Sequence, residues 1–308
     1  MPPSDSLPEP NEPRVSVVLA AQNSHDSLTG CLDSLSAAGA GSNDLEIVLV
    51  DLGSRDGSDS LDAAYPWLVM MRLPLNFGLT RGHNVGIRVA KGEYIVIMNP
   101  RVRVEPETLS TMVRALDGRA DAAAAICQII DDKGESLPQT FPLPVRSVLA
   151  EACRQNQDPP AAIPSGEFVE AARPWLIMVR RRFIAGMNYL DEKRYWNSWS
   201  EVDMFRQVRS SGKKTLFVPG VRAVISGAER RPSTAAGRAL AAADRAAGAC
   251  SYLAKQEGFM AGLGLKVSLL LSSFGRVLTF REPGYHLRLF ANLLGGVAVD
   301  GTQGGELS

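Results

Sequence analysis

Three short apolar segments, each followed by a polar loop, constrain the fold of this chain more than any other feature. They cover residues 45–50, 69–73 and 93–98, and a helical stretch that ends near Ala90 separates the last two. Apolar runs of this length are typical of strands that are buried on both faces of a parallel sheet. The repeated order of strand, loop and helix therefore predicts a doubly wound, mostly parallel α/β sheet.

Several polar side chains follow these strands directly. Asp51 and Asp56 come after the first of the three strands, and Asn99 and Arg101 come after the third. Open α/β sheets bind ligands beyond the carboxyl ends of their strands, so we expect a ligand site there. The carboxylate of Asp51 could accept a hydrogen bond from the N–H of a pyrimidine ring, or it could cap the turn that follows.

Four motifs in this part of the chain resemble those of the family 2 glycosyltransferases, and in particular their bacterial rhamnosyltransferase-type members. The motifs are VSVVL at 15–19 with Asn23-Ser, VDLGSRDGS at 50–58, Asn76-x-Gly78 with Asn84-x-Gly86-Ile, and GEYIVIMNP at 92–100. The resemblance in order and spacing runs from about Arg14 to Gly227. It implies an inverting, nucleotide-sugar-dependent enzyme with a GT-A fold, which is Rossmann-like.

The resemblance also implies roles for individual residues. Asn23, Asp51 and Asp56 are expected to bind the nucleotide, and Asn99 and Arg101 are expected to lie near the diphosphate. We interpret the asparagines and glycines of the third motif as structural, because they suit a tight loop and a helix packed closely against the sheet.

The metal site of the family is altered in this chain. Members usually hold Mn or Mg on a DxD-like motif, which neutralises the leaving diphosphate. Close relatives read Asn-Pro-Asp where this chain reads Asn99-Pro100-Arg101, and the stretch that matches a second, histidine ligand reads VISG at 224–227. Arg101 could replace the cation, since arginine binds phosphate through two N–H groups. Alternatively the site is inactive, or Arg101 faces solvent. We assign no metal ligand, and a divalent cation stays open.

The predicted base lies later in the chain. An inverting transferase needs a carboxylate to take the proton of the acceptor hydroxyl. The segment that resembles the family's ED motif reads SEVD at 200–203, and Glu201 aligns with the catalytic aspartate. The alternative role for Glu201 is that of a carboxylate at a helix start. We place Asp203, Trp175 and Trp199 on the acceptor side, where the tryptophans could stack on a sugar ring or fill a site that is no longer open.

The composition changes near residue 232. Residues 235–256 are rich in alanine and predict a helix that ends at Gly258, and residues 263–280 and 285–297 predict two more. Four basic residues stand among the aliphatic ones of the last two helices: Lys266, Arg276, Arg281 and Arg288. These helices could lie on an anionic bilayer, or they could cap the core or a second subunit. No uninterrupted apolar run approaches the length of a membrane span.

We divide the chain into a disordered lead-in at 1–13, a GT-A domain at 14–231, a C-terminal helical region at 232–300 and a disordered tail at 301–308. The lead-in has no basic region before an apolar core, so it does not resemble a signal peptide. Residues 137–166 contain six prolines and are expected to form a loop or lid. A net charge of zero argues against nucleic acid as a partner. The four scattered cysteines fit the reduced thiols of a cytosolic protein.

The sequence therefore predicts transfer of a hexose or deoxyhexose from a nucleotide sugar to a glycan or a lipid-linked acceptor, in polysaccharide or cell-envelope synthesis. The reaction could need no metal. We expect a cytoplasmic protein that could be peripheral to the inner membrane and could form a homo-oligomer. The alternative is a catalytically inactive, glycosyltransferase-like scaffold that pairs with an active enzyme.

Overall fold

The computed structural model describes residues 12–227, 234–278 and 283–295. Its strands are β1 (Val15–Ala21), β2 (Leu45–Asp51), β3 (Leu68–Arg72), β4 (Tyr94–Met98), β5 (Val102–Val104), β6 (Ala122–Ile130), β7 (Thr140–Phe141), β8 (Phe168–Val169), β9 (Ala171–Ala172), β10 (Leu176–Arg180) and β11 (Lys214–Ile225). Its helices are α1 (His25–Ala37), the short 3-10 helix η1 (Ser58–Ala63), α2 (Leu79–Val89), α3 (Thr108–Asp117), α4 (Arg146–Gln155), α5 (Arg181–Gly186), α6 (Ser200–Ser210), α7 (Ala235–Glu257), α8 (Phe259–Leu278) and α9 (Pro283–Gly295).

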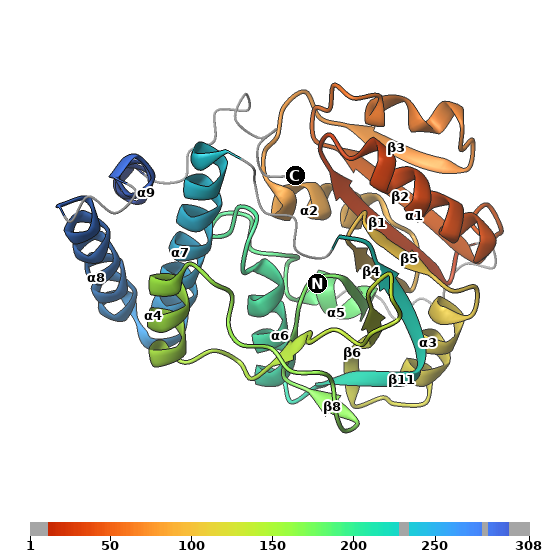
Figure 1. Cartoon of the computed structure of the whole chain (residues 1–308). Coiled ribbons are helices and arrows are strands. Elements are labelled where there is room, and N and C mark those ends of the chain that lie inside the picture. Colours follow the sequence, from red (N-terminus) through yellow and green to blue (C-terminus); the bar gives the residue numbers. More distant parts are fainter. Residues whose placement is uncertain (1–11, 228–233, 279–282, 296–308) are drawn as a thin grey trace.

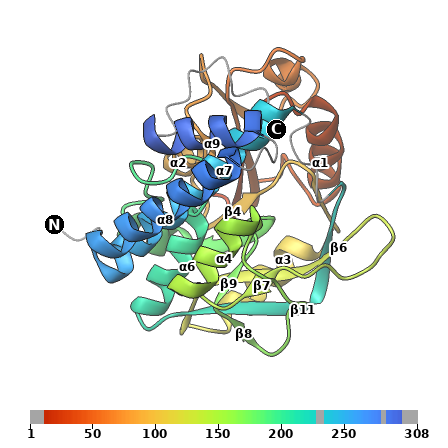
Figure 2. The same ribbon diagram turned by 60° about the vertical axis from the view of Figure 1, so that its left-hand side comes forward.

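The main sheet has the strand order β3-β2-β1-β4-β10-β6-β11-β5 in the described part of the chain, and β8 lies beside β11. The strands from β3 to β4 are parallel, β10 is antiparallel to both of its neighbours, and β6 and β11 are again parallel. Helices cover both faces of the sheet, and α7, α8 and α9 lie to one side of it (Figures 1 and 2). The predicted doubly wound α/β sheet with C-terminal helices is confirmed.

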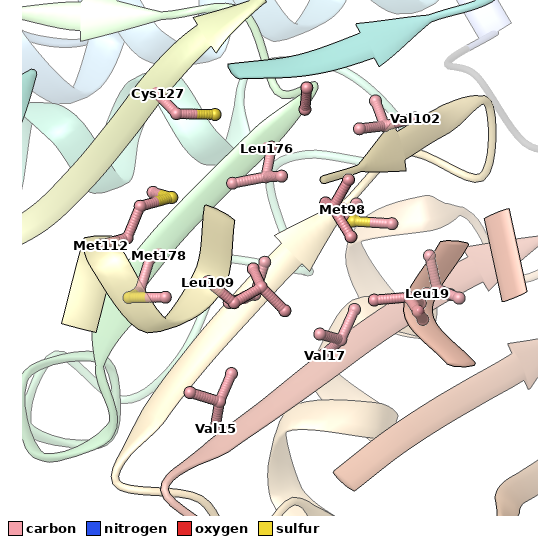
Figure 3. Close-up of a cluster of buried hydrophobic side chains, with 14 of the residues drawn as sticks. Val15, Val17, Leu19, Met98, Val102, Leu109, Met112, Cys127, Leu176 and Met178 are labelled. Carbon is pink, nitrogen blue, oxygen red and sulfur yellow. The ribbon is translucent and has the colours of Figure 1, made fainter. Parts of the chain in front are cut away.

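One face of the sheet packs against α1 and α3. Alternate residues of β1, namely Val15, Val17 and Leu19, point to this face, and they contact Met98 of β4 and the apolar side of α3. Figure 3 shows this cluster, with Met112 of α3 lying over β10. A period of two along β1 and a period of 3.6 along the helices therefore build this core, as expected for an α/β sheet.

The other face packs against α2 and α6. A Cβ atom on Gly86 of α2 would lie only 2.4 Å from Cγ1 of Val18, so the helix can approach β1 this closely only with glycine there. Asn84, on the same helix, accepts a hydrogen bond from Leu190 N at 3.0 Å and donates one to Leu190 O at 2.8 Å. These contacts support the structural interpretation of the third motif.

The C-terminal helices have an apolar cluster of their own. Helix α7 ends at Gly258, whose φ of +96° suits glycine, as the sequence predicted. Leu253 of α7 and Leu265 and Leu269 of α8 are buried in this cluster. The predicted tail at 301–308 and Arg281 lie outside the described residues, and so does the predicted lead-in at 1–13 except for its last two residues. One of these two, Glu12, forms an ion pair with Arg181.

One expectation about these regions is wrong. Residues 137–166 are not simply a loop, because they contain β7 and α4, and Leu149 of α4 is fully buried against the C-terminal cluster. One described helix segment, Phe259–Val277, is long and apolar enough to cross a membrane, with a mean hydropathy of 1.2. Glycines, serines and Lys266 divide its apolar residues, so the segment contains no uninterrupted apolar run of that length, as the sequence indicated.

Candidate active site

A cavity of about 460 Å³ opens where β1, β2 and β3 end. Its walls come from the three segments that follow these strands, at residues 22–23, 51–55 and 72–75, together with Asp59. Asn23 and Asp51 line it, and their predicted contact with a nucleotide stays a prediction. Ala21 and Asp51 are partners in the parallel register of β1 and β2, so the two polar groups meet at the same edge of the sheet.

The carboxylate of Asp51 shapes the loop that forms one wall. It accepts hydrogen bonds from Gly53 N at 3.2 Å and from Ser54 N at 3.1 Å. Asn23, with a φ of +47°, extends the same network, because its Oδ1 accepts from Arg55 N at 2.9 Å. The side chains of Asp51, at the end of β2, and of Asn23, after β1, therefore fix the backbone of the loop that lines the cavity.

Asp56 lies behind this wall rather than on the cavity surface. Its oxygens accept hydrogen bonds from His25 N at 3.0 Å and from the Ser58 hydroxyl at 2.6 Å. Burial acts to raise the pKa of Asp56, but the donors from Ser58 and His25 outweigh it and leave the pKa below its ordinary value. In this structure Asp56 joins the start of α1 to η1, and its predicted contact with a nucleotide stays a prediction.

The two places at which the sequence departs from the metal-binding pattern are Arg101, after β4, and residues 224–227, at the end of β11. Asn99 Oδ1 accepts a hydrogen bond from Arg101 N at 3.0 Å. The Arg101 guanidinium donates to the carbonyl oxygen of Gly227 at 3.0 Å, and Ser226 N donates to Arg101 O at 3.2 Å. The loop after β4 and the end of β11 are thus in direct contact, although they are more than a hundred residues apart in the sequence.

The residues at this place do not fit a divalent cation. No group of three or more His, Cys, Asp or Glu side chains in the described ranges could hold a metal ion. The carboxylate of Asp132 accepts hydrogen bonds from the Ser226 hydroxyl at 2.7 Å and from Arg103 at 2.8 Å. The guanidinium of Arg101 supplies only N–H donors, which bind anions, whereas Mn and Mg require oxygen ligands.

Glu201 lies in the first turn of α6 and is only 4% exposed. Its Oε1 is 3.7 Å from Nδ1 of His83 on α2. Burial lowers the pKa of His83 to about 4, so at neutral pH the imidazole is uncharged and the pair is not an ion pair. Burial also raises the pKa of Glu201, and the neighbouring Asp244 adds to this effect.

Four buried polar atoms of α2 and α6 have no hydrogen-bond partner among the described residues: Oγ of Ser200 and Oδ1 of Asp203 on α6, and Oγ1 of Thr80 and Nδ1 of His83 on α2. The two atoms on α2 belong to the same side of that helix, since their positions differ by three. Buried polar groups without a partner are rare, and they commonly bind water or a ligand hydroxyl.

The three acceptor-side residues lie in different places. The carbonyl of Trp175 accepts from Asn99 N at 2.9 Å, so this tryptophan is beside the end of β4. Trp199 is buried against α7, and its indole N–H donates to Arg245 O at 2.9 Å. Asp203 is buried and forms an ion pair of 2.7 Å with Lys255 of α7. In this structure Trp199 and Asp203 thus fix α6 against α7, and the roles that the sequence suggested for them stay predictions.

Sequence reasoning missed four groups of the site: Gln22, Arg55, His83 and Arg72. Gln22 accepts from Asn76 Nδ2 at 2.8 Å, and Arg72 pairs with Asp62 through a 2.6 Å contact. Gln22 directly follows β1, and Arg72 is the last residue of β3. A polar residue at a strand end is a signal that could have indicated both. His83 gave no such signal, because it reaches Glu201 only through the packing of α2 against α6.

A family model described as Glycosyl transferase family 2 matches residues 16–226. The chain therefore belongs to this family of enzymes, as the motifs predicted.

Comparisons with individual proteins add two kinds of likeness. The succinoglycan biosynthesis protein ExoO of Rhizobium meliloti (strain 1021) is 34% identical over 115 residues, which are 37% of this chain and 31% of that protein. The mannosyltransferase PcManGT from Pyrobaculum calidifontis, solved with GDP-Man and Mn2+, is 18% identical with a TM-score of 0.54, over 95% of this chain and 90% of that one. TarS of S. aureus, residues 1–349 with UDP-GlcNAc, is 16% identical with a TM-score of 0.54, over 92% of this chain and 80% of that one. The two structures support the GT-A fold alone.

Proposed function

We propose that this protein is an inverting transferase that moves a hexose or deoxyhexose from a nucleotide sugar to a glycan or lipid-linked acceptor during synthesis of an envelope polysaccharide. Family membership and the motifs of the rhamnosyltransferase type support this proposal. The relative ExoO acts in succinoglycan biosynthesis, and the similar structures bind GDP-Man and UDP-GlcNAc, so sugar nucleotides suit this fold.

On the donor side, the cavity between the ends of β1, β2 and β3 would hold the nucleoside, with Asn23 and Asp51 in its wall. The diphosphate would then extend toward the end of β4, where Asn99 and Arg101 lie. The negative charge that develops on the leaving diphosphate would be stabilised by the guanidinium of Arg101, which keeps its charge at every relevant pH.

On the acceptor side, Glu201 would take the proton of the acceptor hydroxyl as its oxygen attacks the anomeric carbon. The bond between that carbon and the diphosphate oxygen breaks at the same time, so the configuration at the carbon inverts. The raised pKa of Glu201 suits a base, because proton transfer is most effective when the pKa of the base approaches the operating pH. The uncharged His83 next to it would keep the pocket free of a competing positive charge.

The observation that carries this proposal is the contact between Arg101 and Gly227, because it brings a cation to the place where relatives have their metal ligands. Calorimetry with UDP, dTDP and GDP, in manganese and in EDTA, tests it. We expect micromolar binding of one nucleotide that EDTA does not weaken. Arg101→Gln should weaken that binding about tenfold or more, since charge-assisted hydrogen bonds contribute about 1.5–3 kcal/mol. Arg114→Gln, which changes an exposed arginine on α3, is the matched control.

Glu201→Gln separates the catalytic role from the binding role. The variant should bind the nucleotide as the wild type does, and its transfer rate should fall by about 10²–10⁴, the usual contribution of a general base. Unchanged transfer would show that Glu201 is not the base. Binding that appears only with manganese would show that a metal site exists elsewhere, and a folded protein that binds no nucleotide would favour the inactive scaffold.

A further inference from the structure

Helix α8 exposes a continuous stripe of large apolar side chains. Phe259 and Met260 are each 73% exposed, Leu271 is 67% exposed and Phe274 is 50% exposed, and Leu263 and Val267 lie between them. The spacing of three, four and seven residues places these side chains on one side of the helix. Single exposed apolar residues are common on protein surfaces, but a stripe along about four turns of one helix marks an interaction site.

The stripe continues onto α9. The rings of Phe274 on α8 and Phe290 on α9 are 6.0 Å apart between centroids. Leu287 and Leu294 of α9, 60% and 57% exposed, lie on the same side of α9 as Phe290, because their positions differ from it by three and four. Both helices lie on the outer side of α7, away from the sheet (Figures 1 and 2). The two stripes thus form one surface, which we name the α8/α9 surface.

The opposite side of α8 is committed to the protein. Leu265, Leu269 and Ser273 are buried, and Ser273 donates a hydrogen bond to His286 O at 3.0 Å. Only 22% of the apolar segment Phe259–Val277 is buried, in contrast to the core helix of a globular protein. Because one side of α8 packs along α7 and Lys266 lies within the segment, the helix is placed to lie along an apolar phase and not to cross it.

The charges of α8 and α9 indicate what could cover this surface. Neither helix contains an aspartate or glutamate at any described position, whereas Lys266 and Arg288 are present. Arg276 lies on the buried side of α8, where it donates a hydrogen bond to Arg154 O of α4 at 3.1 Å. If two copies met through this surface with twofold symmetry, the described residues of the two helices would offer no carboxylate to pair with Lys266 or Arg288. An anionic lipid surface complements the same arrangement, since it offers both phosphate groups and an apolar interior.

We propose that the α8/α9 surface docks on an anionic lipid bilayer, with the apolar stripe buried at the boundary between headgroups and acyl chains and the basic residues at headgroup level. Such surface helices enter by about 5–10 Å. The proposal depends on the C-terminal helices alone and does not require the proposed transferase activity.

Co-sedimentation of the full chain with vesicles tests the proposal. One set of vesicles contains phosphatidylcholine only, and the other contains equal amounts of phosphatidylcholine and phosphatidylglycerol. We expect binding to the second set that weakens with added salt. Leu271→Ser combined with Phe274→Ser should reduce partitioning about tenfold or more, because burial of each CH₂ group contributes substantially to membrane affinity. Lys266→Gln and Arg288→Gln should each reduce it about fivefold.

The matched control is Val69→Ser combined with Ile163→Ser, which removes two exposed apolar side chains that belong to neither α8 nor α9 and should leave partitioning unchanged. Circular dichroism and thermal unfolding check that each variant is folded. Absence of binding to anionic vesicles, or equal binding to both sets, overturns the proposal. A wild type that is dimeric in sedimentation equilibrium without lipid, together with a monomeric Leu271→Ser/Phe274→Ser variant, overturns it in favour of a second copy of the chain.

Discussion

The environment of Glu201 contains a second buried carboxyl group, that of Asp244 on α7. Asp244 accepts hydrogen bonds from the Ser198 hydroxyl at 2.5 Å and from Asn197 N at 3.3 Å. These donors do not compensate for its burial, which raises the pKa of Asp244 to about 6. Two carboxyl groups that share a poorly hydrated region disfavour each other's ionisation, so Asp244 helps to keep the pKa of Glu201 high.

A pH dependence of stability follows for Asp244. The folded protein binds the proton of this group more tightly than the unfolded chain does, so its stabilising contribution is complete below about pH 4 and is lost as the pH rises through about 6. A shift of about two units corresponds to about 3 kcal/mol. Asp244→Asn removes this titration and should therefore gain about 3 kcal/mol over the wild type between pH 4 and pH 7.

Urea unfolding of both proteins at pH 4, 5, 6 and 7 measures this difference. Asp62→Asn is a suitable control, because that carboxylate is exposed and its pKa is lowered by Arg72. Its difference from the wild type should stay nearly constant over this range, because a carboxylate with a lowered pKa stays ionised there and loses its stabilising contribution only below about pH 4. Identical pH profiles for Asp244→Asn and the wild type would exclude the proposed titration.

Single residues of the site could be predicted only where sequence order places them. Asp51 ends β2 and Arg101 lies three residues after the end of β4, so their positions at the edge of the sheet follow from the lengths of the apolar runs. His83 and Asp244 lie within helices, and their contacts with Glu201 depend on how α2 and α7 pack around α6. That packing is a tertiary property, so no local pattern in the sequence indicates it.

At the scale of elements, α7 is the helix that connects the site to the C-terminal region. It packs on Trp199, the residue that precedes α6 and has a φ of +82°. A Cβ atom on Gly248 of α7 would lie 2.3 Å from Cδ1 of this indole. Glu201 lies two residues after Trp199. The position of this predicted base therefore depends on the close contact between Trp199 and Gly248 of α7.

Gly248→Ala should therefore displace Trp199. The overpacked contact should reduce the free energy of unfolding by about 1–3 kcal/mol, and transfer should fall while nucleotide affinity is retained. Gly275→Ala on α8 is the matched control, because no atom lies within 4 Å of the added Cβ. There the better helix propensity of alanine should stabilise the protein by up to about 1 kcal/mol. Thermal unfolding and calorimetry distinguish the two variants, and equal effects would contradict the role of the contact.

The elements themselves were predictable to different degrees. The limits of α7 follow from its alanine content and from Gly258, which are local signals. The prediction of a loop at residues 137–166 was wrong because α4 is short and its own sequence gives little sign of a helix. Burial of Leu149 against α7 and α8 stabilises this helix. Long periodic elements are therefore visible in the sequence, whereas short helices that depend on tertiary contacts are not.

At the scale of the whole molecule, the chain contains apolar cores that differ in position and size. The cores on the two faces of the sheet draw on most of its strands, whereas the C-terminal core draws mainly on α4, α7, α8 and α9. Since the C-terminal core is smaller and is built largely from neighbouring helices, we expect it to open at a lower free energy than the sheet.

The four cysteines can measure this difference, because they are divided between the two regions. Cys31 and Cys127 are buried in the sheet core, and Cys153 and Cys250 pack in the C-terminal core. Burial raises the pKa of Cys127 and Cys250 to about 12 and that of Cys153 to about 11, so each thiol reacts appreciably only after its region opens. In mild urea, thiol labelling followed by mass spectrometry of peptides should modify Cys153 and Cys250 before Cys31 and Cys127. Labelling in strong denaturant, where all four should react alike, is the control. If all four cysteines are labelled at one rate in mild urea, the chain opens as a single cooperative unit and the C-terminal helices have no independent stability.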